Sequence, residues 1–598
     1  MKHLLKLSLF ILGPFVLAQS GVISGKVVDS NDQFSLPGAT IRIENSNKYT
    51  VSDQNGNYQF LNLTPGIYTI YIDYLGYETI SKQIEVTENK TAVIDFSLNA
   101  GYNELNEVVI VGDYLKGQAK ALNQQKNNGN ITNIISSDQV GRFPDSNIGD
   151  ALKRVTGVTM QNDQGEARNI IIRGLSPELN SVMLNGDRIP SAEGDNRNVQ
   201  MDLIPAEMIS SIEVNKTLTP DMDADAIGGA VNLITRAVPN KERISITASG
   251  GYAPIREKGL YNSAFLYGNR FFNKKLGVVV SGSYQVQNFG SDNIEAVWDK
   301  DENKTYLSQF QIRKYDIQRV RRSASFSADY KFNENNRIDL SAIYNWRDDR
   351  ENRYRVTYRD LEFDEKTGTY KGNIRRQTKG GIDNNRNKNT RLEDQRVYNV
   401  SLRGEHLLSP KIDMDWAVSY SKASEDRPNE RYIDYRAKGV TFNEDLSDAK
   451  YPNVTTTSAE DLTKFKVSSL SEQHNYTDET EFGAKLNFRV PLSVIPNQKG
   501  RLRFGGRLRL KDKVRENIFY SYESIDEMGN LSTQNPVNWS SNRFNAGKKY
   551  QAGYFYSNHQ LGNLDLNNTN LFKSNLEPSK YLASNYKAKE YISAGYIR

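Results

Sequence analysis

Cysteine is absent from the 598-residue sequence, so neither disulfide bonds nor thiolate metal ligands are available to the chain. Histidine is scarce as well, and none of its four copies occurs in the His-Glu-x-x-His spacing that a zinc peptidase requires. No Ser/His/Asp or paired-carboxylate arrangement is supported by residue spacing either. The sequence therefore predicts no catalytic residues, no metal site, no cofactor and no enzymatic activity.

Long hydrophobic runs are also missing. Only 37% of the residues are hydrophobic, and no stretch approaches the roughly 20 apolar residues of a membrane-spanning helix. The longest apolar run, Leu4 to Ala18, follows Lys2 and Lys6 and ends in small residues suited to cleavage, which predicts a secretory signal peptide over residues 1–20. The net charge of +5 is too small to indicate a nucleic-acid partner.

From Ile244 onward the chain contains segments in which polar and apolar residues alternate. Between Ser323 and Phe332 every odd-numbered residue is polar and every even-numbered residue is apolar. The same pattern recurs over residues 338–347, 412–421 and 481–490. Ile343 is the one exception in the first of these. A period of two residues predicts a β-strand with two unlike faces.

The lengths of the connections distinguish a membrane barrel from a soluble β-sandwich, because both would show this alternation. Tight links alternate with long polar segments along the chain. The tight links lie near residues 273–275, 333–336, 409–411 and 491–499, and the long segments near residues 288–317, 351–394, 425–475 and 514–589. All short connections therefore share one end of the strands, as in outer-membrane barrels, whose apolar residues face lipid. We predict a mainly β fold, with about ten strands of a transmembrane antiparallel β-barrel over residues 239–598.

The exported part of the chain opens with a separate small module. Seven short β-rich runs occur between Val22 and Leu98, separated by turn signals such as Asn55-Gly56. Runs of this number and length suit a small β-sandwich over residues 21–99. Residues 52–60 (SDQNGNYQF) and 63–68 (LTPGIY) resemble the carboxypeptidase regulatory-like domain. That resemblance implies an accessory module without catalytic residues.

Residues 100–130 are interpreted as a linker that contains one apolar, β-prone segment, Glu107 to Gly112. By composition alone this segment is either an eighth strand of the sandwich or a free strand that adds to the edge of another protein's sheet. Residues 105–112 resemble the TonB box of TonB-dependent receptors. The resemblance implies that the coupling protein TonB binds Glu107, Val108, Val109, Ile110 and Val111.

A third region, residues 131–238, combines one helical pattern with short strands in an α+β arrangement. Apolar residues recur at helical spacing from Ile148 to Val155, after the cap candidates Asp145 and Ser146. Short strands are predicted at residues 169–173, 181–184 and 211–215. Five pieces of this region resemble, in order, the plug domain of a TonB-dependent receptor: residues 145–158, 170–174, 184–186, 212–214 and 228–236. The resemblance to this family extends from residue 100 onward.

The resemblance implies a plug inside a 22-stranded barrel in the outer membrane of a Gram-negative bacterium, with the sandwich in the periplasm. It also implies a TonB–ExbB–ExbD complex that pulls the plug, so that a scarce nutrient of carbohydrate or iron-siderophore type is imported. Because residues 591–598 alternate like a strand with no partner after them, we expect the chain to be incomplete at its C-terminus. Two open sheet edges in lipid would then prevent a stable closed pore. The alternative from another class is a surface adhesin or scaffold anchored by a barrel.

The same resemblance assigns roles to individual residues. Arg173, in an Arg-Gly pair, is a candidate latch to acidic barrel residues, with an ordinary strand-end charge as the alternative. The candidate nutrient contacts in the plug loops are Ser176, Glu178, Asn180, Arg188, Glu193, Asp195 and Arg197. In the outer loops, side chains such as Tyr354, Tyr358 and Arg376 suit sugars and anionic chelates alike.

Two charged patterns have simpler interpretations. Residues 221–225 begin like a calcium loop, but Ala226 and Asn232 replace the glycine and glutamate that such a loop needs, which predicts an ordinary plug loop. A lumen-facing basic column either attracts anions or balances acidic plug residues, and we favour balance. The column comprises Arg501, Arg503, Arg507, Arg509 and Lys511.

Overall fold

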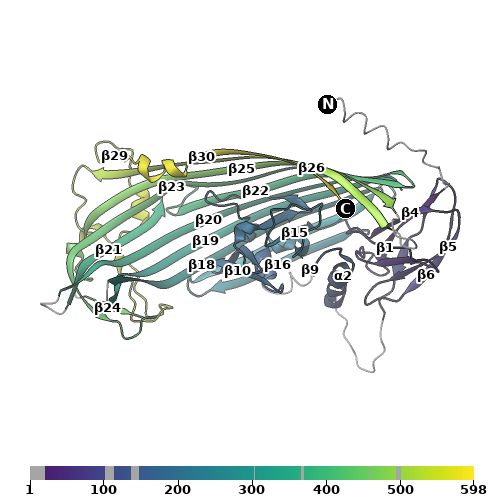
Figure 1. Cartoon of the computed structure of the whole chain (residues 1–598). Coiled ribbons are helices and arrows are strands. Elements are labelled where there is room, and N and C mark those ends of the chain that lie inside the picture. The colour runs from purple at the N-terminus through teal and green to yellow at the C-terminus, as the bar shows by residue number, and fades with distance from the viewer. Residues whose placement is uncertain are drawn as a thin grey trace, which may run out of the picture.

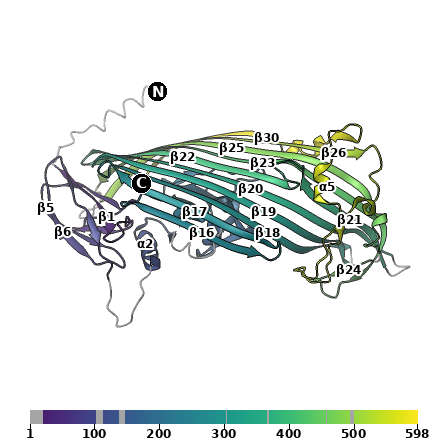
Figure 2. The same ribbon diagram turned by 180° about the vertical axis from the view of Figure 1, so that it is seen from behind.

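A twisted sheet of long antiparallel strands makes up most of the computed structural model (Figures 1 and 2). A mixed α/β region lies against one face of this sheet, and a small sandwich lies at one end. The structure describes residues 20–101, 113–136, 147–301, 304–364, 369–456, 458–492 and 500–598. The predicted mainly β fold, with a sandwich, a plug and barrel-type strands, is confirmed.

Two four-stranded sheets form the N-terminal sandwich. One contains β1 (Gly21–Asp29), β4 (Asn57–Leu63), β7 (Thr91–Val93) and β8 (Phe96–Leu98), and the other contains β2 (Thr40–Ile43), β3 (Tyr49–Val51), β5 (Gly66–Asp73) and β6 (Ile80–Val86). Their shared core is closed to solvent and includes Ile23, Ile41, Phe60, Ile72 and Phe96. Alternation sends every second strand residue into this core, which is why the sequence predicted these runs.

Helix α2 (Asp113–Asn127) follows the sandwich, where the sequence suggested only a linker. Its alanine, leucine, lysine and glutamine residues favour a helix, but its apolar residues are too few to mark one face. Ala121 is buried, whereas Leu122 is exposed. A search for hydrophobic periodicity therefore misses this helix. The coupling segment at residues 107–111 lies outside the described residues.

The plug is built on a mixed sheet of five strands. Their order is β13 (Asp187–Arg188), β12 (Asn180–Leu184), β15 (Gly229–Thr235), β14 (Ile209–Asn215) and β9 (Thr132–Ser136). The plug also contains a hairpin, a helix and three 3-10 turns: β10 (Val158–Asp163), β11 (Glu166–Ile172), α4 (Ile148–Leu152), η1 (Pro177–Leu179), η2 (Met201–Leu203) and η3 (Ala206–Met208).

The N-cap of α4 is Asn147, whose side chain accepts a hydrogen bond from the backbone amide of Asp150. The cap candidates Asp145 and Ser146 lie outside the described residues. Within the described ranges, no helix combines the length and the apolar character needed to cross a bilayer.

Within the described residues the large sheet has 13 strands, and ten long neighbouring strands of it form what we call the wall. These ten agree in number with the sequence prediction of about ten strands. They are β16 (Arg243–Ala253), β17 (Lys258–Phe271), β18 (Leu276–Asp301), β19 (Lys304–Asn333), β20 (Asn336–Asp364), β22 (Arg391–Ser409), β23 (Ile412–Asp445), β25 (Lys466–Leu492), β26 (Gly500–Ser524) and β30 (Tyr586–Ile597). Each pairs antiparallel with the next.

The two faces of the wall differ as the alternation predicted. Apolar side chains are exposed on the face away from the plug, among them Phe326, Leu340, Tyr420 and Leu486. Polar side chains are buried on the other face, among them Arg319, Arg321, Asn345, Arg347 and Ser421. Ile343, which breaks the alternation, joins the apolar core of the plug. The polar face of the wall is therefore the face that meets the plug.

Short turns near residues 272–275, 333–336 and 409–412 join the wall strands at one end, which we call the mouth. At the other end the strands continue far past the predicted limits. Of residues 288–317, interpreted from the sequence as a loop, residues 288–301 and 304–317 belong to the paired strands β18 and β19. The alternation fades there while the hydrogen-bond ladder continues, so periodicity alone places the strand ends too early.

The long connections fold into a unit with its own core, which we call the loop dome. It contains β21 (Thr369–Gly381), β24 (Asn453–Thr455), β27 (Val537–Asn538), β28 (Tyr554–Phe555), α5 (Asn558–Asn563) and β29 (Phe572–Leu576). These elements gather at the end of the wall that lies farthest from the sandwich (Figure 1). The dome core is rich in aromatic side chains and includes Phe310, Tyr354, Phe442, Phe465 and Phe555, all at most 1% exposed.

Candidate functional site

The plug packs its apolar residues mainly on one another. Among the described residues, three from the wall join the apolar core of the plug: Ile343, Val397 and Ala423. The rest of that core comes from the plug itself. Polar and ionic contacts therefore decide how the plug sits on the wall.

The first ionic contact centres on Glu166 of β11, which is 1% exposed. Its Oε2 atom accepts hydrogen bonds from Arg319 Nη1 and Arg321 Nη2, each at 2.5 Å. Both arginines project from β19, and Arg319 also pairs with Asp349 at 2.7 Å. Burial alone would raise the pKa of Glu166, but the guanidinium charges of Arg321 and Arg319 outweigh burial and lower it to about 2. This carboxylate therefore stays ionised at neutral pH.

The second contact centres on Asp202 of η2, which has no exposed surface. Arg347 of β20 forms an ion pair with its carboxylate and a further ion pair with Glu393 of β22 at 2.9 Å. Arg321 Nε donates to the carbonyl oxygen of Asp202 at 2.8 Å. Loss of one partner from such a cluster leaves an uncompensated buried charge, which costs about 3–5 kcal/mol. Glu166 and Asp202 thus fix the plug against the middle of the wall.

The third contact centres on Asp187 of β13. Arg403 of β22 pairs with its carboxylate, and Ser401 Oγ donates to it at 2.7 Å. Lys485 Nζ of β25 lies 3.5 Å away. Burial opposes ionisation of this group, but the charges of Lys485 and Arg403 outweigh burial and lower the pKa of Asp187. These ionic contacts between plug and wall, which we call the plug seat, thus extend to one further strand, β25.

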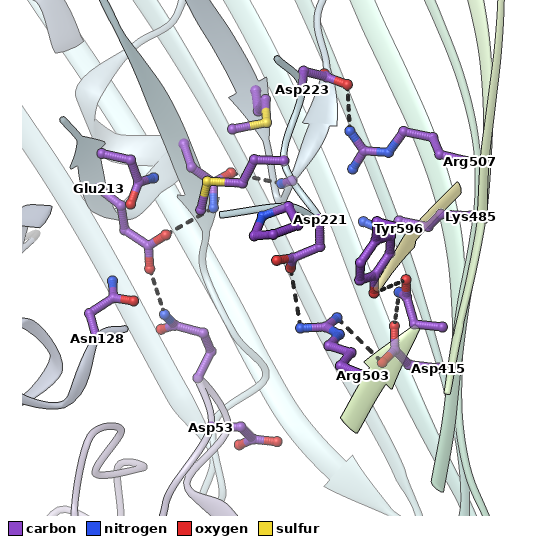
Figure 3. Close-up of a pocket in the computed structure, with 18 of the residues that line it drawn as sticks. Asp53, Asn128, Glu213, Asp221, Asp223, Asp415, Lys485, Arg503, Arg507 and Tyr596 are labelled. Atoms are coloured by element: carbon purple, nitrogen blue, oxygen red, sulfur yellow. Dashed lines mark hydrogen bonds and ion pairs between the residues drawn. The ribbon is translucent and has the colours of Figure 1, made fainter. Parts of the chain in front are cut away.

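The plug loop at residues 221–225 meets the basic column of β26 (Figure 3). Asp221 pairs with Arg503 at 3.2 Å, and Asp223 pairs with Arg507 at 2.6 Å. Acidic residues at every second position of the loop therefore face arginines on one face of a strand. The interpretation that the basic column balances acidic plug residues agrees with this geometry.

A cavity of about 560 Å³ lies between the plug loop at residues 188–197 and the strands β25, β26 and β30. Three of the predicted nutrient contacts line it: Arg188, Asp195 and Arg197. Both arginines pair with Asp225 of the plug at 2.5 Å, and Asp195 pairs with Arg515. The charged residues that the wall adds are Glu479, Arg509, Lys511, Lys513, Arg515, Lys589 and Glu590. The cavity is thus lined by charged side chains of both signs.

The other predicted nutrient contacts lie elsewhere on the plug. Glu193 pairs with Arg168 at 3.0 Å. Asn180 is buried and donates to the Ile170 carbonyl oxygen at 3.0 Å. Ser176 and Glu178 are exposed at the 3-10 turn η1. The sequence identified the plug loops, but it did not reveal which loop faces the cavity.

A second cavity, of about 870 Å³, lies nearer the mouth, where sandwich, helix α2, plug and wall meet (Figure 3). On β26 it is lined by residues from Arg503 to Arg509, whereas the first cavity is lined by residues from Arg509 to Arg515. Since β26 starts at the mouth, the plug loops stand between a cavity toward the dome and a cavity toward the sandwich.

Comparison with known proteins identifies two of the three regions. Residues 23–110 match the CarboxypepD_reg-like domain family, and residues 124–230 match the TonB-dependent receptor plug domain family. The chain carries the domains of a TonB-dependent receptor. The family resemblance that the sequence motifs predicted is thereby confirmed.

Sequence relatives of the chain are matched over limited stretches. It is 28% identical over 231 residues to the TonB-dependent receptor P3 of Formosa agariphila, a stretch covering 38% of the chain and 21% of that protein. It is 30% identical over 120 residues to the vitamin B12 transporter BtuB of Photobacterium profundum, a stretch covering 20% of each. The matched segments thus span about a fifth of the length of these relatives. Among solved structures, the siderophore receptor PirA of Acinetobacter baumannii aligns over 80% of the chain and 92% of its own, at 10% identity and a TM-score of 0.27.

The proposed latch Arg173 lies directly after β11, with a left-handed φ of +56°. Its Nε donates to the Gly228 carbonyl oxygen at 2.9 Å and its Nη2 to the Ile227 carbonyl oxygen at 2.8 Å. Both acceptors belong to the plug itself. A tie from Arg173 to acidic barrel residues therefore stays a prediction.

Sequence reasoning missed the carboxylates that seat the plug, Glu166, Asp187 and Asp202. No motif surrounds them, and their side-chain partners on the wall lie 145 to 298 positions away in the chain. One available signal was Arg319 and Arg321, two arginines at alternate positions on the lumen face of a strand. Charge on that face requires a partner inside the lumen.

Three outer-loop residues help to hold the loop dome together in this structure: Tyr354, Tyr358 and Arg376. All three are buried. Arg376 donates to the carbonyl oxygens of Ala552 at 2.8 Å and Ala459 at 3.0 Å. Aromatic side chains supply the apolar surface that a loop dome needs for a core, so composition alone did not separate core residues from nutrient contacts.

Proposed function

We propose that this receptor imports a scarce nutrient across the outer membrane of a Gram-negative bacterium by energised displacement of its plug. The chemistry of the plug seat carries the proposal, because buried ion pairs surround Glu166, Asp187 and Asp202 while few apolar wall residues take part. Charged groups regain hydration when such an interface opens, whereas an apolar core loses its main source of stability. A plug seated in this way is able to leave and return.

The energy for displacement comes from outside the chain in this proposal. TonB, driven by its partners ExbB and ExbD, grips the segment Glu107 to Val111 by adding it as a strand to its own sheet. This segment directly precedes helix α2 in the sequence. The Ile134 amide of plug strand β9 donates to Gln125 Oε1 of α2 at 2.6 Å. A pull on the segment therefore reaches the plug through the helix.

The nutrient is a polar molecule of carbohydrate, iron-siderophore or cobalamin type. The charged side chains that line the 560 Å³ cavity support this class over an apolar one. Arg188, Asp195 and Arg197 are the first contacts to test, because they line that cavity. The remaining candidate contacts, Ser176, Glu178, Asn180 and Glu193, are expected to act only if the plug loops rearrange. The relatives are named as receptors and transporters, and we propose that this chain likewise catalyses no reaction.

The receptor sits with its mouth toward the periplasm. Short turns face the periplasm in outer-membrane barrels, and long connections face outward. The exposed apolar side chains on the outer face of the wall, such as Phe326 and Leu486, then meet lipid. This orientation puts the N-terminal sandwich in the periplasm and the loop dome outside the cell.

Deleting residues 107–111 tests the proposal. A strain without the receptor is first grown on iron chelates, cobalamin and assorted glycans as limiting nutrients, which identifies the nutrient it fails to use. Complementation with the deletion variant is expected to restore binding of that nutrient to the cell surface but not growth on it.

Deleting residues 102–106 serves as the matched control and is expected to leave growth intact. If the variant lacking residues 107–111 grows like the parent, coupled import is wrong. Normal growth of the strain without the receptor on every nutrient tested, while the parent still binds one of them at its surface, favours the surface adhesin or scaffold.

A further inference from the structure

The N-terminal sandwich touches the mouth of the wall at several places (Figures 1 and 2). The backbone amide of Asn62 donates to the Pro410 carbonyl oxygen at 2.9 Å, in the turn between β22 and β23. Thr91 Oγ1 donates to Asn335 Oδ1 at 2.9 Å, in the turn between β19 and β20. Two neighbouring turns of the mouth thus contact the sandwich, one at Asn62 and the other at Thr91.

A third contact lies just before β16, the first strand of the wall. Lys26 Nζ donates to Asn240 Oδ1 at 2.5 Å, and Asn240 Nδ2 donates to the Gln33 carbonyl oxygen at 2.7 Å. From β16 to β23 there are six strand spacings, each about 4.8 Å, which gives about 29 Å. A folded unit of about 80 residues has a diameter of about 30 Å. The sandwich is therefore wide enough to span this part of the mouth.

The 870 Å³ cavity lies directly behind the sandwich. Asp53 and Gln54 of the sandwich line it on one side, and Asp415 and Arg503 of the wall line it on the other (Figure 3). Gln54 Nε2 donates to Glu213 Oε1 of plug strand β14 at 2.8 Å. A molecule that passes the plug toward the mouth thus enters a space bounded by the sandwich.

Helix α2 joins the sandwich to the plug. Asn127 Nδ2 donates to the Gly38 carbonyl oxygen at 2.8 Å, and the Leu75 amide donates to Asn123 Oδ1 at 3.1 Å. Gly38 has a φ of +77°, and a Cβ atom there would lie 2.7 Å from the backbone nitrogen of Gln124. The helix therefore packs tightly on the sandwich. A force that moves the helix is transmitted to the sandwich through these contacts.

We infer that the N-terminal sandwich is a lid over the mouth of the wall. It closes the space behind the plug while docked, and it leaves the turns at Pro410 and Asn335 when the nutrient passes, an inference that rests on the proposed import function. Its contacts with the turns are few and polar, as in domain interfaces that open readily. Because α2 is seated on both the sandwich and the plug, the pull that moves the plug also undocks the lid.

Cross-linking the lid to the mouth tests this inference, and the chain supplies no competing thiol because it has no cysteine. Asn62→Cys with Pro410→Cys makes one pair, and Thr91→Cys with Asn335→Cys makes a second. The contacts at 2.9 Å bring both pairs near disulfide range. Both pairs are expected to form disulfides in isolated outer membranes, and oxidised cells are expected to lose uptake of the limiting nutrient until a reductant restores it.

A matched control places the disulfide inside the lid, at Thr69→Cys with Gln83→Cys, which face each other across β5 and β6. This control is expected to keep uptake when oxidised. Failure of both lid pairs to cross-link would show that the sandwich is not docked, and full uptake with the lid cross-linked would show that it is not a lid. Either result overturns the inference.

A second measurement requires no transport, so it separates failure of the lid from failure of the import function. Asp415→Cys places a single thiol in the covered cavity, and its labelling by a maleimide is followed in isolated membranes. Adding Lys26→Ala and Thr91→Ala, which remove two docking contacts, is expected to raise the labelling rate several-fold. An unchanged rate overturns the inference even if import itself is never observed.

Discussion

The seat of the plug and the core of the loop dome are both closed to solvent, yet they are held together by opposite chemistry. At the seat, carboxylates such as Glu166 and Asp202 meet arginines of the wall, and three apolar wall residues join the plug core among those described. In the dome, aromatic and aliphatic side chains from several connections form one core. In the proposed import, apolar packing is used where the parts stay together, and ionic contacts are used where the parts separate.

Free energies explain this division. An apolar core loses the whole hydrophobic contribution when it opens, about 25 cal/mol per Å² of apolar surface. A buried ion pair contributes little net stability compared with an apolar pair of the same shape, because both charges regain water on opening. Removing only one partner is costly, however, so the ionic seat still specifies a single plug position.

The largest expected effect comes from Glu166→Ala, which leaves Arg319 and Arg321 without their shared carboxylate. We expect the free energy that holds the plug in its seat to fall by about 3–5 kcal/mol. A protease should then cleave the plug at a lower urea concentration in outer-membrane preparations. Glu178→Ala, at an exposed position of the same domain, is the control. A loss below about 1 kcal/mol, the range of a surface pair, would mean that the seat is not ionic.

Phe465→Ala tests the apolar core of the loop dome. Its side chain is fully buried in the dome core, and such a truncation costs about 3–5 kcal/mol. We expect protease cleavage within the dome to accelerate while the urea dependence of plug proteolysis stays unchanged. Leu582→Ala, at an exposed position, is the control. A parallel loss at the plug would show that dome and seat unfold as one unit.

A smaller effect is expected at Asp223 and Arg507. Asp223→Arg alone or Arg507→Asp alone places like charges together, and each is expected to weaken the seat by about 1–2 kcal/mol; the double variant restores the pair and should recover part of the loss. Plug proteolysis in urea measures all three. If the loss of stability in the double variant equals the sum of the losses in the two single variants, the two side chains do not interact.

The smallest effect concerns pH. The folded pKa of Glu166, about 2, lies below the ordinary value of 4.5, so its contribution is fully present above pH 4.5 and is lost as pH falls toward 2. The difference in plug stability between the parent and Glu166→Gln should therefore stay constant from pH 8 to about pH 5 and shrink below that. A difference that already vanishes at pH 6 would contradict the assigned charge state.

Much of the fold was predictable from sequence because the two faces of the wall have different surroundings. Lipid on one face and the plug on the other impose a period of two, and residues 323–332 show it without interruption. Helix α2 and the long arms of β18 and β19 were not predictable in this way, because α2 has few apolar residues and the arms contribute side chains to the dome core. Local propensity and ladder pairing hold these elements, and neither leaves a strong periodic pattern.

The candidate site was predictable only in outline. Motifs identified the plug and placed Arg188, Asp195 and Arg197 on a loop that does line a cavity. The partners of Glu166 and Asp202 were hidden, because contacts between residues more than a hundred positions apart depend on how strands align, which one sequence does not encode locally. The burial of Arg376 was hidden for a related reason, since a charged residue inside an aromatic core looks like a surface residue in the sequence.

The length of the wall strands has a consequence for how a nutrient reaches the plug. Strand β23 has 34 residues, which extend over about 110 Å at about 3.3 Å per residue. The lipid-facing band of an outer-membrane barrel is only about 25 Å tall, so even a tilted strand carries the dome tens of ångströms beyond the bilayer. Capture would then occur far from the lipid, and the captured molecule would diffuse along one dimension, down a hydrophilic surface, before it meets the plug.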